Sequence, residues 1–155
     1  MISNATAIIC LSRINKLDLI KKIYTFILIP SSVKKEVLVI GKGGYHSISN
    51  ALNKGWIKVV DPKKSIDLGL GAGENATINL ARERKDSIIL DDAYAIKAAR
   101  TFNINIIRTT SIIFMAVKKK LITKDEAITI INSLIGIGYY ISPKEYSVIL
   151  TKLMK

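Results

Sequence analysis

Cysteine is almost absent from this chain, which has one, Cys10, among 155 residues. A lone cysteine excludes a disulfide framework or a thiolate metal cluster within one chain, and its apolar surroundings predict a packing role. Long hydrophobic runs are also lacking, because no window reaches the roughly 18 apolar residues that a membrane-spanning helix needs. The apolar run at residues 5–11 is short and no basic segment precedes it, unlike a secretion signal. We therefore expect a cytoplasmic protein.

Acidic residues are scarce: 12 Asp and Glu stand against 24 Lys and Arg, so the formal net charge is +12. Such an excess predicts a surface that attracts polyanions, and nucleic acid is the leading candidate. Because the lysines are dispersed along the chain, they favour contact with phosphates over the reading of bases. The alternative source of a Lys- and Ile-rich composition is genome bias or heat tolerance.

Short apolar bursts alternate with segments of helical period, which predicts a β/α order. We expect strands at residues 1–3, 26–29, 57–60, 88–90 and 105–107. We expect helices at 6–14, at 17–24, after Ser31 or Ser32, at 46–54, after the glycine loop at 69–73, around 95–99, and throughout 111–155. Strands separated by helices favour a parallel sheet with helices on both faces. The prediction is one α/β domain over residues 1–155, a three-layer sandwich with a central parallel sheet of about five strands.

Residues 71–99 are the most informative segment, because they set acidic side chains at the ends of neighbouring elements. A buried strand stops at Asp91-Asp92, and Glu74 opens the helix after the glycine loop. Ligands gather at the carboxyl ends of parallel strands. Together with Glu36, early in the helix after the second strand, these carboxylates would repel one another strongly without a cation. Oxygen-only ligands suit Mg²⁺ or Mn²⁺, and such a site supports phosphodiester hydrolysis.

Each acid also has a structural interpretation. Glu36 fits a solvated helix face, Glu74 fits a first-turn acid favoured by the helix dipole, and Asp91-Asp92 fits an N-cap pair. Because all three positions coincide with strand ends, the structural interpretations taken together are less favoured than a shared site. Thr6 is open to the same choice between a helix cap and a ligand contact.

Other motifs are interpreted as structural. The glycine loop at 69–73 follows a polar connector rather than a buried strand and has no Gly-Lys-Ser/Thr ending, which disfavours nucleotide binding. Trp56 and the Tyr139-Tyr140 pair are predicted to pack rather than to stack on bases, although a basic surface with exposed aromatics would fit RNA. Thr109, at the end of the fifth strand, is expected either to cap a helix or to contact a ligand.

The sequence resembles a PIN domain, in particular the branch related to VapC-type toxin ribonucleases, which carries G-x-G-E and L-D-D motifs. The two motifs stand here at residues 71–74 and 90–92. The resemblance covers most of the chain. Its matching segments are residues 2–6, 17–20, 29–30, 33–38, 71–81, 88–99 and 109–116.

The resemblance implies catalytic roles for Asn4, Glu36, Glu74 and Asp92, and a Mg²⁺ or Mn²⁺ ion held by Glu36, Glu74, Asp91 and Asp92. Position 4 departs from the family, which has Asp where this chain has Asn. An amide oxygen can coordinate a metal, but it brings no negative charge and cannot act as a general base. Metal affinity and turnover should therefore fall, by about 10- to 100-fold or more.

The function that the resemblance implies is a metal-dependent endoribonuclease of the toxin type, weakened or silenced by Asn4. Its hydrolysis of RNA would leave a 5′-phosphate on the product. It further implies RNA as substrate, a homodimer, and a small antitoxin-like protein that inserts into the acidic cleft. The alternative is a catalytically inactive module on the same fold that binds RNA or an antitoxin-like protein. A nucleotide-dependent enzyme, the third class, would require tight binding of NAD or ATP.

Overall fold

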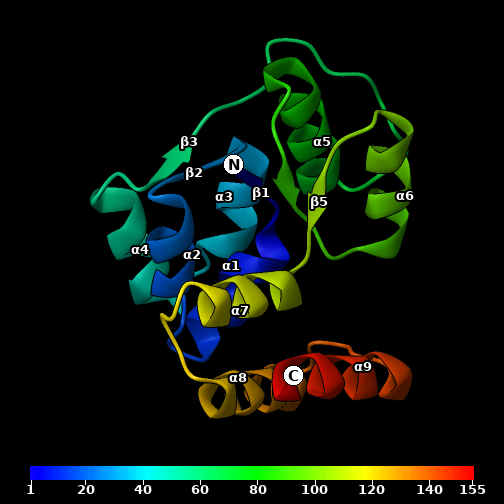
Figure 1. Ribbon diagram of the computed structural model, residues 1–155. Coiled ribbons are helices and arrows are strands. Elements are labelled where there is room, and N and C mark those ends of the chain that lie inside the picture. Colours follow the sequence, from blue (N-terminus) through cyan, green and yellow to red (C-terminus); the bar gives the residue numbers. More distant parts are fainter.

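Five short strands form one parallel sheet at the centre of the computed structural model, which describes residues 1–155 (Figure 1). They are β1 (Ile2–Ser3), β2 (Ile27–Ile29), β3 (Ile57–Val59), β4 (Ile88–Ile89) and β5 (Ile106–Ile107). The spatial order is β3-β2-β1-β4-β5, and every neighbouring pair is parallel. All five predicted strands are confirmed, each slightly shorter than expected. The chain winds outward on one side of β1 and then crosses to the other side, so the switch point of the sheet lies between β1 and β4.

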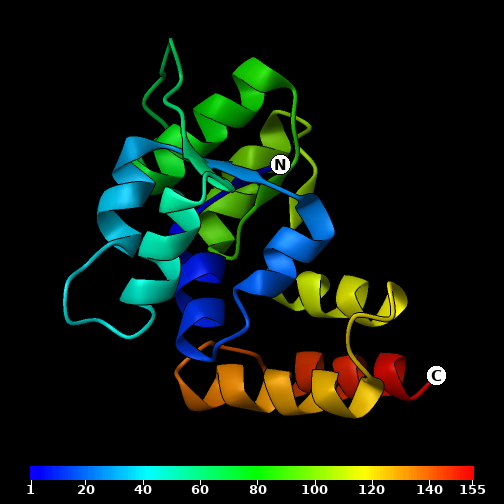
Figure 2. The ribbon, with the colours of Figure 1, turned by 90° about the vertical axis from the view of Figure 1, so that its left-hand side faces the viewer.

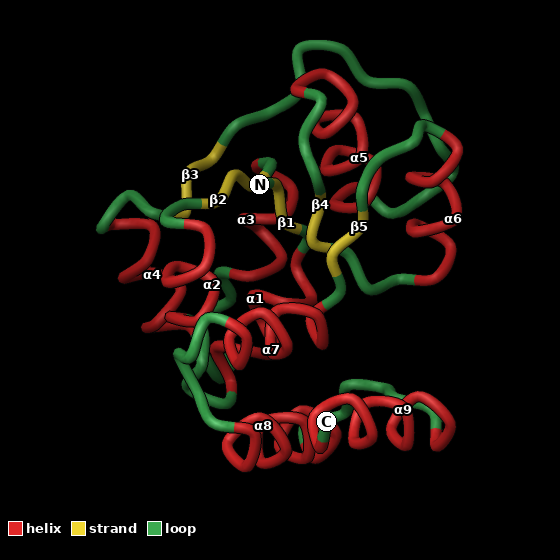
Figure 3. Tube along the Cα trace, viewed as in Figure 1, coloured by secondary structure: helices red, strands yellow, loops and turns green.

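The chain has nine helices, and those that cover the two faces of the sheet confirm the predicted three-layer α/β sandwich (Figure 3). They are α1 (Ala5–Arg13), α2 (Asp18–Tyr24), α3 (Ser31–Val37), α4 (Tyr45–Asn53), α5 (Ala72–Arg84), α6 (Ala93–Thr101), α7 (Thr109–Lys118), α8 (Lys124–Gly136) and α9 (Pro143–Met154). None of them combines the length and the apolar character that a membrane crossing requires.

Alternating strand residues divide the core between the two faces of the sheet. Ile27 and Ile29 point into a cluster of 26 buried residues with α1, α2, α4 and α7, while Leu28 points to the opposite face. There a second cluster of 10 buried residues joins β1 and β4 to α5 and α6. Because successive side chains of a strand point to opposite faces, a strand of two or three apolar residues can serve both clusters.

The C-terminal helices form a hairpin that packs on α7 rather than on the sheet (Figure 2). The helical segment predicted for residues 111–155 is therefore three helices separated by two turns. Both hairpin helices begin with a capping box, Thr123 with Glu126 in α8 and Ser142 with Glu145 in α9. Each box satisfies backbone N–H groups that the first helical turn leaves unpaired, and so sets where the helix starts.

Gly44 provides a test of how α4 meets α1. Gly44 and Gly41 both have a positive φ, +89° and +81°, but a Cβ on Gly44 would overlap the Ser12 hydroxyl, whereas a Cβ on Gly41 meets nothing within 4 Å. Gly41→Ala should lower the free energy of unfolding by about 1–2 kcal/mol, the cost of a left-handed backbone. Gly44→Ala should lower it by about 1–3 kcal/mol more, because the added methyl displaces α1. Urea unfolding measures both losses, and equal losses would contradict this packing.

Candidate functional site

Three of the predicted site residues meet at the carboxyl end of β1, around Gly73. Asn4 directly follows β1, is 2% exposed, and donates from Nδ2 to Glu74 Oε1 at 3.2 Å. Glu36 lies against Gly73, where an added Cβ would overlap its carboxylate and come within 3.4 Å of Asn4 Oδ1. Glu36 is predicted early in the helix after the second strand, but this helix, α3, is only seven residues long, so Glu36 stands in its last turn. The missing side chain at Gly73 is what allows β1, α3 and α5 to bring these groups together.

The electrostatics of this group follow from partial desolvation of the Glu36 carboxylate, although Glu36 as a whole residue is exposed. Burial, and then the neighbouring Glu74 carboxylate, raise the pKa of Glu36 above its ordinary value. Asn4 Oδ1 is a buried acceptor without a hydrogen-bond partner. An unsatisfied buried oxygen beside two carboxylates is costly, and it leaves a set of oxygen donors of the kind that Mg²⁺ and Mn²⁺ prefer.

The fourth predicted residue, Asp92, is the N-cap of α6. Its Oδ1 accepts a hydrogen bond from the Ala95 N–H at 2.8 Å, which confirms the capping interpretation. The cap uses one of the two carboxylate oxygens, and Asp92 lines the same cleft as Glu74. No group of three or more His, Cys, Asp or Glu side chains lies close enough together to hold a metal ion. The metal-binding role of these acids stays a prediction.

Asp91 has an environment unlike that of its neighbour, because its side chain is only 7% exposed. Its Oδ1 accepts from the Thr109 N–H at 3.0 Å and from the Tyr139 hydroxyl at 2.5 Å, and its Oδ2 accepts from the Thr109 hydroxyl at 2.6 Å. Arg108 Nε lies 3.7 Å from the same carboxylate. Asp91 therefore joins the end of β4 to the start of α7 and to the turn between α8 and α9, and its predicted part in metal binding stays a prediction.

A cleft of about 840 Å³ lies along this edge of the sheet and holds cationic groups beside the acids. Arg13 of α1, Arg100 of α6 and Arg108 after β5 all line it. We name this hollow the edge cleft. Arg100 stands two turns after Asp92, and Arg13 two turns after Thr6, on helices that both start at the sheet edge. Neither arginine is among the residues predicted from the sequence, although this spacing could have revealed both.

The tyrosine pair predicted to pack is split by the structure. Tyr139 is 7% exposed, as predicted, and burial and then Asp91 raise the pKa of its phenol, which keeps the hydroxyl a donor. Tyr140 is 78% exposed and lines the edge cleft, so the packing prediction is wrong for this residue. Trp56, 9% exposed, packs in the core as predicted.

Neither threonine expected to cap a helix does so. Asn4 is the N-cap of α1, and Thr6 lies inside that helix and lines the edge cleft. Arg108 is the N-cap of α7, and the Thr109 hydroxyl is used on Asp91. Thr109 thus orders a carboxylate of the site rather than the end of a helix.

Cys10 lines the edge cleft as well as packing against the core. Burial, and then Asp91, raise the pKa of its thiol, while Arg13 acts in the opposite direction. A thiol with a raised pKa stays protonated at neutral pH and is a weak nucleophile. Cys10 therefore contributes surface to the cleft and no thiolate chemistry.

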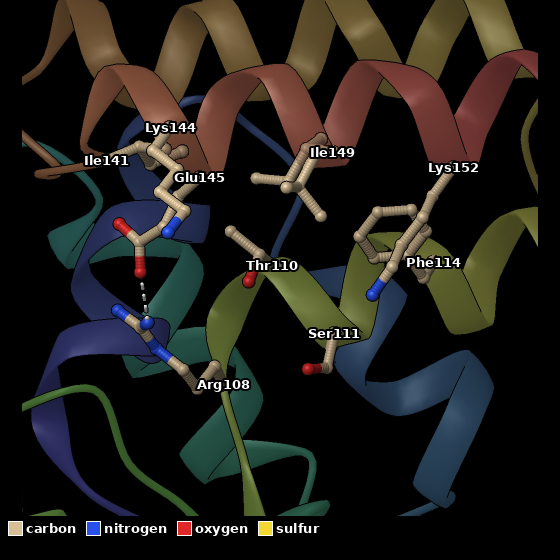
Figure 4. A pocket seen from close by; sticks show the side chains of 10 residues that line it. Arg108, Thr110, Ser111, Phe114, Ile141, Lys144, Glu145, Ile149 and Lys152 are labelled. Atoms are coloured by element: carbon tan, nitrogen blue, oxygen red, sulfur yellow. Dashed lines mark hydrogen bonds and ion pairs between the residues drawn. The ribbon is translucent and has the colours of Figure 1, made fainter.

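A second hollow, of about 320 Å³, lies between α7 and α9 (Figure 4). Phe114 and Ile149 give it an apolar lining, and Lys152 reaches toward it from α9. Arg108 and Glu145 line both this groove and the edge cleft, and their ion pair, at 3.1 Å, stands between the two.

Comparison with known proteins gives one match. A family model described as a PIN domain matches residues 1–155. No curated protein matches the sequence. No solved structure matches it either.

Glu36 should make stability depend on pH with a defined sign. Its pKa is raised in the folded chain, so the native state binds the proton more tightly than the unfolded state, and stability falls as the pH rises through that raised value. In EDTA, Glu36→Gln should therefore have a higher free energy of unfolding than the wild type. This difference should be larger at about pH 7 than at about pH 4. Urea unfolding at both values measures the gain.

Glu126→Gln is the control with the opposite sign. The Thr123 backbone N–H lowers the pKa of Glu126, so this carboxylate stabilises the fold at neutral pH and loses that effect as the pH falls. Glu126→Gln should be less stable than the wild type at neutral pH and approach it in acid. A gain for Glu36→Gln that is the same at both pH values would contradict a raised pKa for Glu36 in the folded chain.

Gly73→Ala should alter the site while leaving the fold in place. Alanine favours a helix by up to about 1 kcal/mol over glycine, and this gain offsets the cost of moving the Glu36 side chain, so the free energy of unfolding should change little. The new methyl overlaps the Glu36 carboxylate, which must move toward water, and the pKa of Glu36 should fall toward its ordinary value. Titration of the Glu36 carboxyl by carbon NMR measures this shift. Gly136→Ala, at the end of α8 with nothing within 4 Å of its Cβ, should leave the Glu36 titration unchanged.

Proposed function

The chain belongs to the PIN-domain family, whose members are generally nucleases, and we propose that it is a metal-dependent endoribonuclease of the toxin type. The observation that carries the proposal is the convergence of Asn4, Glu36 and Glu74 on Gly73 at the carboxyl end of the central strand. Active sites of open parallel sheets form at that edge, next to the switch point.

The edge cleft supports a polyanionic substrate. Arg13 and Arg100 line it, and neither forms an ion pair with a carboxylate. The chain carries a formal net charge of +12, so its long-range field also attracts nucleic acid. A strand bound by these arginines would pass the carboxylates of Glu74 and Asp92 in the same cleft.

The oxygen donors fit Mg²⁺ or Mn²⁺ in kind, because they comprise two carboxylates and the unpartnered amide oxygen of Asn4. In the proposal Glu36 and Glu74 hold the ion, with Asn4 Oδ1 and Asp92 beside them. Bound there, such an ion supplies an activated water and offsets charge on the phosphate. Asp91, whose oxygens already accept three hydrogen bonds, assists by holding the end of β4 against α7.

Asn4 weakens this site in a specific way. Its Nδ2 donates to Glu74 Oε1 and so offsets part of the charge that a cation would otherwise balance. Asn4 also lacks a proton-accepting carboxylate. We therefore propose slow turnover and weak metal affinity for this chain.

A second candidate function is a PIN-fold module without turnover that binds RNA or an antitoxin-like protein. Two observations favour it: the hydrogen bond from Asn4 to Glu74, and the lack of any three carboxylates close enough to share an ion. In this case the edge cleft serves binding alone.

The resemblance to VapC-type toxins adds two elements to the proposal, a homodimer and a small antitoxin-like protein that covers the acidic cleft. A single domain over residues 1–155 and a cytoplasmic location complete it, and these come from the length and from the lack of long apolar runs. The exposed hairpin of α8 and α9 offers surface for such contacts (Figure 2).

Asn4→Asp should convert the site into a stronger metal centre. A third carboxylate at position 4 replaces the donor that faces Glu74, so ribonuclease activity in Mn²⁺ should rise by about 10- to 100-fold. The variant should unfold at a lower temperature than the wild type in EDTA and regain stability when Mn²⁺ is added, because only the ion relieves the new repulsion. Cleavage of a labelled RNA strand and thermal unfolding measure the two effects.

Asn53→Asp, at the exposed end of α4, is the matched control, because it adds the same charge far from the site. It should leave activity and its metal dependence unchanged. Glu74→Gln in the Asn4→Asp background should abolish the gained activity, which excludes a contaminating nuclease. RNA binding without cleavage by both the wild type and Asn4→Asp would refute the nuclease and leave the binding module.

A further inference from the structure

We propose that Tyr140 is a stacking platform for one unpaired base of a single-stranded RNA, and that Arg13 and Arg100 hold the phosphates beside that base. The inference rests on the proposed function in requiring an RNA strand in the edge cleft, but it does not require cleavage. It adds a base subsite, carried by the turn between α8 and α9, to the cleft that Glu74 and Asp92 also line.

Exposure alone does not single out Tyr140. Tyr94, in the first turn of α6, is 80% exposed against 78% for Tyr140, and isolated aromatic residues on a surface are ordinary. The difference lies in position. Tyr140 lines the edge cleft together with three arginines, whereas Tyr94 lines none of the hollows described above.

The backbone that carries Tyr140 is held on both sides. Tyr139 is buried, donates its hydroxyl to Asp91, and donates its N–H to Leu134 O at 3.0 Å. Ile141 packs against the main core cluster. Only the side chain of Tyr140 is left to move, so stacking on it orders few torsions and costs little entropy.

Arg13 connects the phosphate contacts to this turn. Its Nη1 donates to Ile137 O at 3.4 Å, which brings the guanidinium to the segment that carries Tyr140. Arg13 and Arg100 form no ion pair with a carboxylate, whereas Arg108 pairs with Asp91 and Glu145. Two uncompensated guanidinium groups beside an exposed ring match the alternation of phosphate and base along a single strand.

A single strand suits this arrangement better than a duplex or a protein. The flat face of a base is available to an aromatic ring only where the base is unpaired and splayed out of a stack. Tyr and Arg are also frequent in protein–protein interfaces. The net charge of +12 and the two unpaired arginines favour a polyanion over a protein surface of mixed charge.

The test is equilibrium binding in EDTA, where cleavage does not interfere, read by fluorescence anisotropy. The probes are a labelled oligouridine of about 10 nucleotides, a strand of equal length whose central nucleotides are abasic, and an RNA duplex of equal length. Tyr140→Ala should raise the Kd for oligouridine about 5- to 100-fold, the effect expected for one lost base–aromatic stack. Tyr140→Phe should retain the wild-type Kd within about 3-fold, because the ring and not the hydroxyl makes the stack.

The controls separate stacking from charge and from folding. Tyr94→Ala should bind all three probes as the wild type does. Tyr140→Ala should leave the Kd for the abasic strand and for the duplex unchanged. Arg100→Gln should weaken the binding of oligouridine and of the abasic strand alike. It should also reduce the slope of log affinity against log salt concentration by about one released counterion. Thermal unfolding of Tyr140→Ala should match the wild type, because the side chain is exposed.

Each contrary outcome has one meaning. Unchanged oligouridine affinity in Tyr140→Ala overturns the proposal and leaves the ring to a protein partner. An equal loss on the oligouridine and abasic strands also overturns it, because Tyr140 would then shape the cleft rather than stack. If the wild-type protein binds no RNA, RNA is refuted as the ligand in both proposed functions. If it binds RNA with a Kd that does not depend on the Tyr140 side chain, only this inference is refuted.

Discussion

Carboxylates gathered at one edge of a parallel sheet repel one another, and the structure of this chain depends on the donors that it supplies to them. Glu74 receives the Asn4 amide, and Asp92 receives the Ala95 N–H in the first turn of α6. Asp91 receives a backbone N–H and two hydroxyls. The pKa of Glu36 is raised, since partial desolvation of its carboxylate and then the Glu74 charge both disfavour its ionised form. Asp91, whose side chain is the most buried of these acids, is thus the one that receives the most donors.

The Tyr139 hydroxyl and two arginines attach the C-terminal hairpin to the edge cleft. Tyr139 reaches Asp91 from the turn between α8 and α9, Arg108 pairs with Glu145 of α9, and Arg13 reaches the carbonyl of Ile137. The hairpin otherwise contacts mainly α7 (Figure 2). One wall of the cleft is therefore attached to the acidic edge through polar contacts, which are directional and place Tyr140 beside the arginines.

Much of the fold could be predicted, because each strand is a short apolar burst between helix-period segments, and β/α alternation permits few parallel arrangements. The approach of Asn4, Glu36 and Glu74 was expected from the family resemblance. The different states of Asp91 and Asp92 could not be predicted, because adjacent residues after a strand point in opposite directions, and only the partners that face each one decide its role. The same limit explains why Tyr139 and Tyr140 received one interpretation.

The sequence by itself determined the three-layer architecture, the excess of positive charge, and the amide in place of a carboxylate at position 4, since these follow from local periodicity, composition and identity. The tertiary structure alone decided which donor each acid receives, how Gly73 admits Glu36, and where the hairpin presents Tyr140. Those features join residues far apart in the chain, and their geometry depends on packing at a few tenths of an ångström, which no local pattern encodes.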